Sequence, residues 1–460
     1  MKKLLIIMFA TLVSVATFAN DVLVSAISLT GQTTTGALNT HYTNVQFNIG
    51  WKNSWRTSTN ESNYDGCWIF IKYRKQSTSV WLHATLNATG QTAPAGSVLK
   101  PSNDSKGAWI YRATDGIGDV TYNTAQLRWN YGADGVLDNE NVEVQVYAVE
   151  MVYCPTGAFN LGNASTETSK FRDGVVDTWF PITSEAAITC GISAGNLTAS
   201  GSFLNSGSIP AAYPKGYNAF WVMKYEFSEQ QYVDFLNTLD QTNATNKNNI
   251  GATGLVPNMV ANSPEKAARG FSPLNLLAWL DWAAMRPMTE FEFEKACRGN
   301  NNTPSPLEYA WGNTTIAQVA TPTAQNTATE TWATGNASYS SSIVIRCGAL
   351  ATATSNRISS GATFYGAMEM SGNNAEPTVY AGNAQGRSYT GLHGDGVLTA
   401  TAEANTPNWP SSTNNPCVLF RGGGNGNVTF QLQVSDRSAG INDYTTPATA
   451  NGGRGVRTGE

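Results

Sequence analysis

The most constraining feature of the sequence is a sharply bounded helix, predicted within residues 286–299, RPMTEFEFEKACRG. Thr289 is a good N-cap, and the side chain of Glu292 can accept a hydrogen bond from the N–H of that cap, which makes a capping box. Gly299 provides the stop. Three apolar residues at helical spacing form one stripe: Phe293, Ala296 and Cys297. We expect this stripe to pack against a core, with acidic residues at the helix start and basic residues at its end.

Residues 20–148 show the pattern of short β-strands separated by clusters of Gly, Asn, Ser and Asp. The predicted strands are 45–51, 67–73, 80–86, 108–112, 125–129 and 142–146. Many short strands at such intervals are typical of an all-β sandwich of immunoglobulin type. The acidic loop at 134–141 lacks the spacing of an EF-hand, so we interpret it as a solvated turn rather than a calcium site.

The rest of the chain is predicted to have few helices and much irregular structure, which makes the fold class α+β. A strand at 220–227 precedes a helix that begins at Ser228, with Gln231 as its capping-box partner. Ser272 and Pro273 have the types preferred at the N-cap and the first position of a further helix. Other predicted segments are the helix at 274–285, a loop at 241–262, small strands within 314–360, and strands at 418–424 and 430–437.

The boundary between the two regions carries no linker. The strand at 142–147 runs almost directly into the next strand, which begins at residue 149. We therefore divide the chain into a leader at 1–19, a β-sandwich at 20–148 and a second domain at 149–460, and expect the two domains to be rigidly joined.

The charge balance narrows the possible partners. Charged residues make up 13% of the chain, which is about half the usual share. Neutral polar residues fill the difference, as is typical of secreted proteins. The net charge is −5 and no basic cluster is present, so we expect no nucleic-acid partner.

The first residues have the pattern of a secretory signal peptide. Lys2 and Lys3 precede an apolar run at 4–16, and small residues follow at the cleavage positions 17 and 19. The apolar run is short for a membrane span, so we expect a cleaved leader rather than an anchor. The mature protein is then not membrane-spanning, and it is exported to the cell surface, the extracellular space or the periplasm.

The sequence contains six cysteines: Cys67, Cys154, Cys190, Cys297, Cys347 and Cys417. An even number in an exported chain permits disulfides, but the spacing selects no pairing. No pair of cysteines, or of cysteine and histidine, has the spacing of a zinc site. Cys297, on its predicted helix, is expected to be a small buried hydrophobic residue.

Several segments, in this order, resemble motifs of the sulfatase-modifying-factor family, whose founding activity is the formylglycine-generating enzyme. They are the strand pair at 150–162, the strand and helix at 220–239, the helix at 286–299, YAWGN at 309–313, GAMEMSGNNAE at 366–376, RGGG at 421–424 and VR at 456–457. The helix segment is similar to the family's R-L-P-T-E-x-E-W-E-x-A-x-R-G. The resemblance implies a C-type-lectin-like fold for 149–460. Surface proteins of Bacteroidetes often place a β-domain before it, and the chain resembles an exported member of that kind.

The resemblance does not extend to the catalytic centre. The family's enzymes hold copper and the substrate thiol with a cysteine pair shortly after R-G-G-S, because thiolates are the soft ligands that Cu(I) prefers. At those places this chain has Asn427 and Leu432, and Cys417 lies before the turn. The iron-dependent branch of the family uses several histidines, whereas this chain has three, two of them before residue 149. We therefore expect the chain to bind neither copper nor iron and to be a non-catalytic member of the family.

A calcium site is also implied by the resemblance. Asn373 and Glu376 match the calcium-binding Asn and Glu of the family's G-N-x-x-E motif, and oxygen ligands suit a hard cation. Ala375 and Pro377 stand where the family has tryptophans, so the alternative is a turn-stabilising Asn and a solvated Glu.

In this family the C-terminal loops surround the cleft. The candidate ligand-binding residues there are Trp409, Asn425, Asn427, Asp436, Arg437, Asn442, Asp443 and Tyr444. Aromatic, amide and carboxylate groups can stack on and hydrogen-bond a sugar, or form an adaptable protein-binding surface. Taken singly, each is better interpreted as part of a solvated loop. Three arginines, Arg421, Arg437 and Arg457, are expected to be buried and structural.

Together these features predict an exported, non-enzymatic protein of the cell envelope. Its formylglycine-enzyme-like module would bind a protein or glycan, or serve as a structural component. The alternative is a copper-dependent oxidase that converts a protein cysteine to formylglycine through a rearranged centre, such as Cys347 with Cys417. The pairing of the cysteines distinguishes the two hypotheses.

Overall fold

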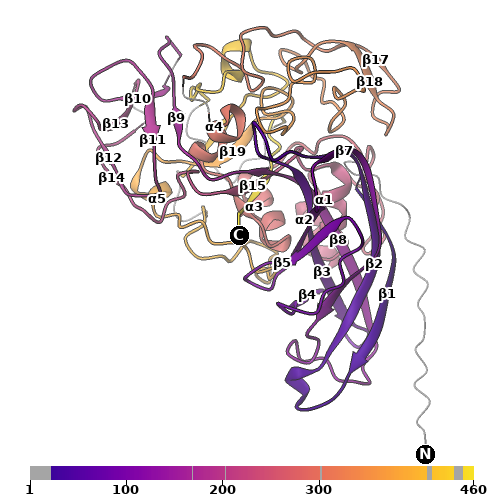
Figure 1. Ribbon diagram of the computed structural model, residues 1–460. Coiled ribbons are helices and arrows are strands. Elements are labelled where there is room, and N and C mark those ends of the chain that lie inside the picture. Colours follow the sequence, from indigo (N-terminus) through magenta and orange to yellow (C-terminus); the bar gives the residue numbers. More distant parts are fainter. Residues whose placement is uncertain (1–21, 168, 202–203, 301–302, 412–416, 440–448) are drawn as a thin grey trace, which may run out of the picture.

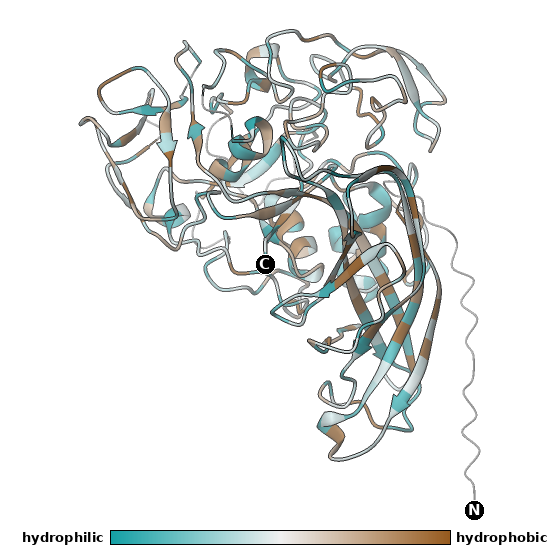
Figure 2. Ribbon diagram, in the orientation of Figure 1, coloured by the Kyte–Doolittle hydropathy of each residue, from teal (hydrophilic) through white to brown (hydrophobic). Residues whose placement is uncertain are grey.

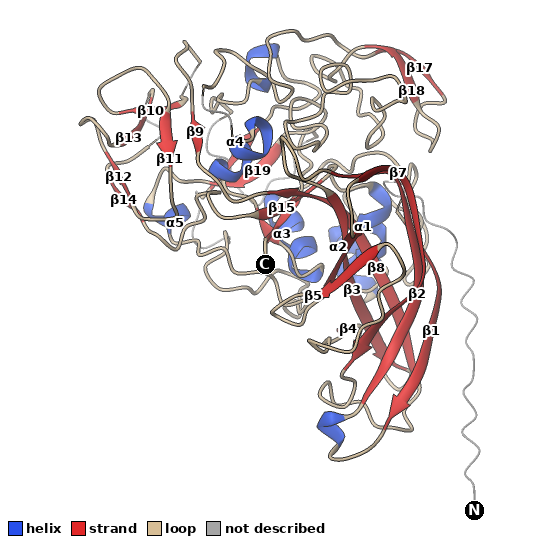
Figure 3. Ribbon diagram, viewed as in Figure 1, coloured by secondary structure: helices blue, strands red, loops and turns tan. Residues whose placement is uncertain are grey.

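The computed structural model describes residues 22–167, 169–201, 204–300, 303–411, 417–439 and 449–460. The predicted leader at 1–19 lies outside these residues. The described part is an α+β structure that contains far more strand than helix (Figure 3). None of the described helices combines the length and the hydropathy that a membrane span requires.

Two sheets contain the long strands. The first has the order β1 (Leu23–Thr33), β2 (Tyr42–Arg56), β7 (Gly116–Trp129). The second has the order β16 (Arg286–Pro287), β21 (Gly455–Thr458), β15 (Phe220–Met223), β8 (Val142–Cys154), β3 (Asp65–Lys75), β6 (Ala108–Arg112), β5 (Ser97–Pro101), and β4 (Leu82–His83) pairs with β3. Figure 1 shows the N-terminal strands gathered on one side of the molecule. The predicted strand at 80–86 is thus reduced to two residues, and the others lie where the pattern predicted them.

The N-terminal core lies between these two sheets. Along β2 the residues Val45, Phe47, Ile49 and Trp51 are buried while their neighbours are partly exposed, as the two-residue period of a strand requires. They share one hydrophobic cluster with Ile69 of β3. The same alternation appears as brown and teal segments along the strands in Figure 2.

Strand β3 is buried on both of its faces. Its odd-numbered residues from Cys67 to Ile71 join the N-terminal core. Its even-numbered side chains point the other way: Trp68 donates a hydrogen bond from Nε1 to the carbonyl of Ala283 at 2.9 Å, and the ring of Phe70 meets that of Trp282 edge-on at 5.0 Å. The second sheet is therefore a middle layer, with the first sheet on one face and a helix on the other.

Strand β8 joins the two regions of the chain. It pairs with β3 from Val142 to Val152 and with β15 from Met151 to Cys154. The expected boundary between residues 148 and 149 falls inside this strand, which continues across it without a break. The N-terminal region and the C-terminal region therefore share one sheet.

The described helices are α1 (Glu229–Leu236), α2 (Gln241–Lys247), α3 (Pro273–Trp282), α4 (Glu290–Arg298) and α5 (Ala384–Arg387). Three of them, α1, α3 and α4, begin where the caps were predicted, whereas α2 and α5 were not predicted. The capping boxes of Ser228 and Thr289 are both formed, and Gly299 follows α4 with a positive φ of 71°. These predictions are confirmed, as is the burial of the stripe that includes Cys297.

Two predicted segments are wrong. The segment 241–262 was expected to be a loop, but it begins with α2, because the side chain of Asp240 caps the amide of Asn243. The segment 430–437 was expected to be a strand, but a 3-10 turn, η2 (Thr429–Leu432), occupies its start. The side chain of Gln431 bonds back to the segment before it, which closes the chain into a turn.

The remaining strands are short, and some of them, such as those at Glu376–Val379 and Val418–Arg421, are buried. They are β9 (Phe159–Leu161), β10 (Phe171–Asp173), β11 (Phe180–Ile182), β12 (Ile188–Cys190), β13 (Leu197–Ala199), β14 (Gly207–Ile209), β17 (Ala320–Thr323), β18 (Thr331–Thr334), β19 (Glu376–Val379) and β20 (Val418–Arg421), with the 3-10 turn η1 (Leu38–Thr40) near the N-terminus. Strands β17 and β18 confirm the small strands predicted within 314–360. In Figure 1 the β9–β14 group and the β17–β18 hairpin lie at opposite edges of the C-terminal region.

Candidate functional site

Helix α4 lies in a buried ionic network that fastens the C-terminal segment to it. Glu290 accepts hydrogen bonds from Nε of Arg437 at 2.6 Å and from Nη1 of Arg421 at 3.4 Å. Nη2 of Arg421 donates to Glu294 at 2.7 Å, and Arg298 donates to the other oxygen of that carboxylate. Burial alone would raise the pKa of Glu294, but the two arginines hold it below its usual value. The prediction of buried structural arginines is confirmed for Arg421, Arg437 and Arg457.

The segment after Arg421 contains Asn427 and Leu432, the two positions at which the family resemblance would place a catalytic cysteine pair. The side-chain oxygen of Asn427 accepts from the amide of Gly424 at 2.7 Å, and its nitrogen donates to Gln431 at 2.8 Å. Leu432 is fully buried in a hydrophobic cluster. Gly423 has a φ of 61°, and a Cβ on it would lie only 2.8 Å from the side chain of Leu432. An amide and a packed aliphatic side chain therefore replace the soft ligands.

The cysteines lie elsewhere in the core. All six are buried, and none is joined to another by a disulfide. Burial raises the pKa of Cys154 and of Cys297, which keeps both as neutral thiols. Cys347 donates from Sγ to the carbonyl of Glu226 at 3.3 Å and packs in a different hydrophobic cluster from Cys417.

Four of the five predicted ligand-binding residues in the described part of the chain lie below the surface. Trp409, Asn425, Asp436 and Arg437 are all buried, and Asn427 is half-buried. The indole of Trp409 donates to the carbonyl of Leu392 at 2.9 Å. The remaining candidates lie outside the described residues: Asn442, Asp443 and Tyr444.

Two apolar side chains that were not predicted are exposed on this face instead. Val428 and Phe430 are each 48% exposed, on and just before η2. Backbone hydrogen bonds hold the segment before them: the amide of Ser340 donates to the carbonyl of Asn427 at 2.9 Å, and that of Ser341 donates to the carbonyl of Asn425 at 2.6 Å. The available sequence signal was the presence of two apolar residues within a stretch rich in Gly and Asn.

The predicted calcium residues lie in a buried acidic cluster. The side-chain oxygen of Asn373 accepts from the amide of Ile345 at 3.0 Å, and its nitrogen donates to Glu226 at 2.5 Å. Oε1 of Glu376 accepts from Nε of Arg454 at 2.8 Å. Both side chains of the predicted pair are buried, so neither a solvated Glu nor an open loop describes them.

Three oxygens of this cluster have no hydrogen-bond partner: Oε2 of Glu369, Oε2 of Glu376 and Oδ1 of Asn374. Burial, followed by the charge of Glu376, raises the pKa of Glu226, and burial raises that of Glu369 to about 7. All three carboxyl groups lie within electrostatic reach of the guanidinium of Arg454, and Glu369 is also within reach of Arg346. Sequence reasoning missed Glu369, although it lies in the same GAMEMSGNNAE motif.

No three His, Cys, Asp or Glu side chains of the described residues are grouped closely enough to hold a metal ion by themselves. A cation in the acidic cluster would therefore need amide, backbone or water oxygens in addition to two carboxylates. The unpartnered amide oxygen of Asn374 provides one of these.

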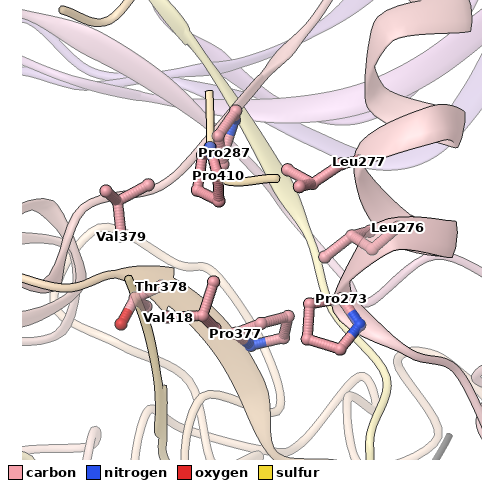
Figure 4. A pocket seen from close by; sticks show the side chains of 9 residues that line it. All are labelled: Pro273, Leu276, Leu277, Pro287, Pro377, Thr378, Val379, Pro410 and Val418. Carbon is pink, nitrogen blue, oxygen red and sulfur yellow. The ribbon is translucent and has the colours of Figure 1, made fainter. Parts of the chain in front are cut away.

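A small apolar cavity lies between α3 and the β19–β20 pair (Figure 4). It encloses about 10 Å³ and is lined by Pro273, Leu276, Leu277, Pro287, Pro377, Thr378, Val379, Pro410 and Val418. The one hydroxyl among them, that of Thr378, already donates to the carbonyl of Leu419 at 2.7 Å. A cavity of that size and polarity is a packing void rather than a ligand site.

Comparison with known families identifies the family of the chain. The sulfatase-modifying factor enzyme 1-like domain matches residues 139–458, which is well over half of the chain. The chain therefore belongs to this family, and the matched region begins just before β8. No curated protein matches the chain.

Proposed function

We propose that the protein is a non-catalytic member of the sulfatase-modifying-factor family that binds a protein partner. The observation that carries the proposal is the segment 425–432, where an amide, a buried leucine and two exposed apolar residues occupy the place of the thiolate pair. The signal-like leader supports export to the cell surface or the periplasm. The long loops and sparse helices of the C-terminal region support the C-type-lectin-like fold that the family resemblance implies.

The chemistry of the thiols supports the absence of copper catalysis. Cu(I) is held by thiolates, and a thiol becomes a ligand only when it loses its proton. Burial opposes that ionisation at Cys154, Cys297 and Cys347. The rearranged pair of Cys347 and Cys417 is not supported, because the two residues pack in separate clusters.

We expect the purified protein, supplied with Cu(I) and oxygen, to form no aldehyde on a cysteine-containing peptide. The physical reason is the lack of two ionisable thiols at one accessible place. Mass spectrometry of the peptide measures the product, and a formylglycine-generating enzyme with its cysteine pair serves as the positive control. Copper-dependent aldehyde formation that is lost in Cys347→Ser or Cys417→Ser would establish the oxidase hypothesis instead.

The exposed side chains favour a protein rather than a glycan as the partner. Val428 and Phe430 present an aliphatic and an aromatic surface without a carboxylate beside them on η2. Apolar contacts at the centre of an interface contribute more to affinity than polar rim contacts. The backbone bonds from Ser340 and Ser341 keep this surface in place, which lowers the entropy cost of binding.

Replacing Val428 or Phe430 by aspartate is expected to abolish capture of the partner from envelope extracts without changing the melting temperature. Loss of a central apolar contact costs about 2 kcal/mol or more in binding, or roughly thirtyfold in Kd. Quantitative pull-down measures the first effect and thermal unfolding the second. Ile117→Asp is the matched control, because Ile117 is 87% exposed on β7. Equal capture by all variants would rule out this surface.

We also propose that the acidic cluster holds a structural calcium ion. Glu369 and Glu376 would bind it through their unpartnered oxygens, together with the amide oxygen of Asn374. The ion would neutralise the carboxylate charge that Arg454 alone leaves uncompensated. Asn373 is not part of this set, because its side-chain oxygen is bonded to Ile345.

A further inference from the structure

A second group of unpartnered oxygens lies where the loop after β9 meets the C-terminal segment. Asn163 donates from Nδ2 to Glu167 and to the hydroxyl of Ser435, the latter at 3.2 Å. The next residue, Asp436, has a carboxyl group close enough to that of Glu167 for the two to repel each other. Two segments that lie far apart in the sequence thus bring an amide and two carboxyl groups together.

One oxygen of each of these side chains has no hydrogen-bond partner: Oδ1 of Asn163, Oε1 of Glu167 and Oδ2 of Asp436. All three side chains are at least nine-tenths buried. An unpaired buried acceptor destabilises the folded protein, and more so when it is charged. Asn163 is bonded to Glu167 and to Ser435, the neighbour of Asp436, so the three unpartnered oxygens belong to adjacent side chains that a positively charged group would satisfy.

The neighbouring cationic side chains bond to other atoms. Arg298 donates to Glu294, Glu308 and Ser435. The ammonium group of Lys170 donates to the backbone carbonyl of Asn163 and to Asp177. The positive charge of Arg421 acts on Asp436. The Nη atoms of Arg421 donate to Glu290 and Glu294 of α4 and to the carbonyl of Val434.

The three available atoms are all oxygens, and all accept hydrogen bonds rather than donate them. Such a set of ligand oxygens excludes an anion as the bound group. It does not suit a soft metal ion either, because a soft ion prefers sulfur or imidazole nitrogen. Two carboxylates and an amide, completed by water, are the ligands that calcium takes in irregular geometry, whereas magnesium demands a near-octahedral set.

We propose that Asn163, Glu167 and Asp436 bind a hard divalent cation, with Ca²⁺ as the best match. The site shares no residue with the acidic cluster of Glu369 and Glu376. A cation there joins the loop at 163–167 to the C-terminal segment and removes the repulsion between two buried carboxylates. It therefore stabilises the face of the molecule that carries η2.

Terbium luminescence tests the proposal on the full chain, because Tb³⁺ replaces Ca²⁺ and is excited through nearby aromatic rings. Tyr309 lies within electrostatic reach of Glu167, and its ring stacks on that of Trp311 at 5.1 Å. We expect wild-type protein to show Tb³⁺ emission that Ca²⁺ displaces and Mg²⁺ displaces far less. Glu167→Gln and Asp436→Asn are expected to weaken this binding roughly tenfold or more, because each removes a charged ligand.

Asp177→Asn is the matched control, since Asp177 belongs to the neighbouring loop but accepts from Lys170. Glu376→Gln separates this site from the acidic cluster and is expected to leave it intact. Native mass spectrometry of wild-type protein, after chelation and after Ca²⁺ addition, counts the bound ions without any substitution. The proposal is overturned if wild-type protein binds no Ca²⁺, or if Glu167→Gln and Asp436→Asn bind it as tightly as Asp177→Asn.

Discussion

Replacing Glu290 by glutamine is expected to lower the free energy of unfolding by about 3–5 kcal/mol, because the removal of one partner leaves buried charges uncompensated. Glu290 is fully buried and accepts from both Arg437 and Arg421. A neutral amide cannot balance the two guanidinium groups. Urea-induced unfolding, followed by fluorescence and circular dichroism, measures the change.

The control for this prediction is Glu143→Gln. Glu143 pairs with Arg74 at 2.7 Å across β3 and β8, but both side chains are about one-quarter exposed. Exposed ion pairs contribute about 0–1 kcal/mol, so this variant is expected to remain close to the wild type. If the two substitutions have the same effect, the network at α4 does not hold the C-terminal segment.

Replacing Trp68 by alanine is expected to cost about 3–5 kcal/mol and to weaken both regions of the chain together. The ring is fully buried between the middle sheet and α3, it donates to Ala283, and the guanidinium of Arg457 lies 3.8 Å from its centroid. The cavity would lie on the α3 side of the sheet, but β3 contributes side chains to both cores, so loosening of this strand is expected to reach the N-terminal core as well. Hydrogen exchange is expected to show faster opening of amides in β2 and in α3 alike.

Trp81→Ala provides the comparison, because Trp81 is half-buried and its ring packs against Arg74 of β3. We expect it to cost about 1 kcal/mol or less, as surface substitutions usually do. If Trp68→Ala speeds exchange in one region and leaves the other unchanged, the shared sheet does not couple them.

The features that the sequence predicted well have local causes. The caps of Ser228 and Thr289 were visible because a side chain bonds to a backbone amide only three residues away. The alternation along β2 was equally visible, since each strand residue faces one side. The strand predicted at 430–437 was wrong because its apolar pattern was the only signal considered. The hydrogen bonds that Gln431 accepts from Asn427 and Val428 fold the start of this segment into a turn.

The features that the sequence did not predict depend on distant partners. Glu290 was interpreted as a residue suited to the helix dipole, but its role is set by Arg421 and Arg437, more than one hundred residues away. The family motif directed attention to Asn373, whereas only the fold shows that its oxygen is occupied.

The continuity of β8 also limits where recombination can divide the gene without disrupting the encoded fold. A recombination point at residue 148 would divide a strand that pairs with β3 on one side and β15 on the other. The transferred C-terminal gene segment would then encode a sheet with an unpaired, hydrophobic edge, which favours aggregation. We therefore expect exchange between genomes to move both regions as one unit, and swaps of the N-terminal region to replace β3 and β8 together.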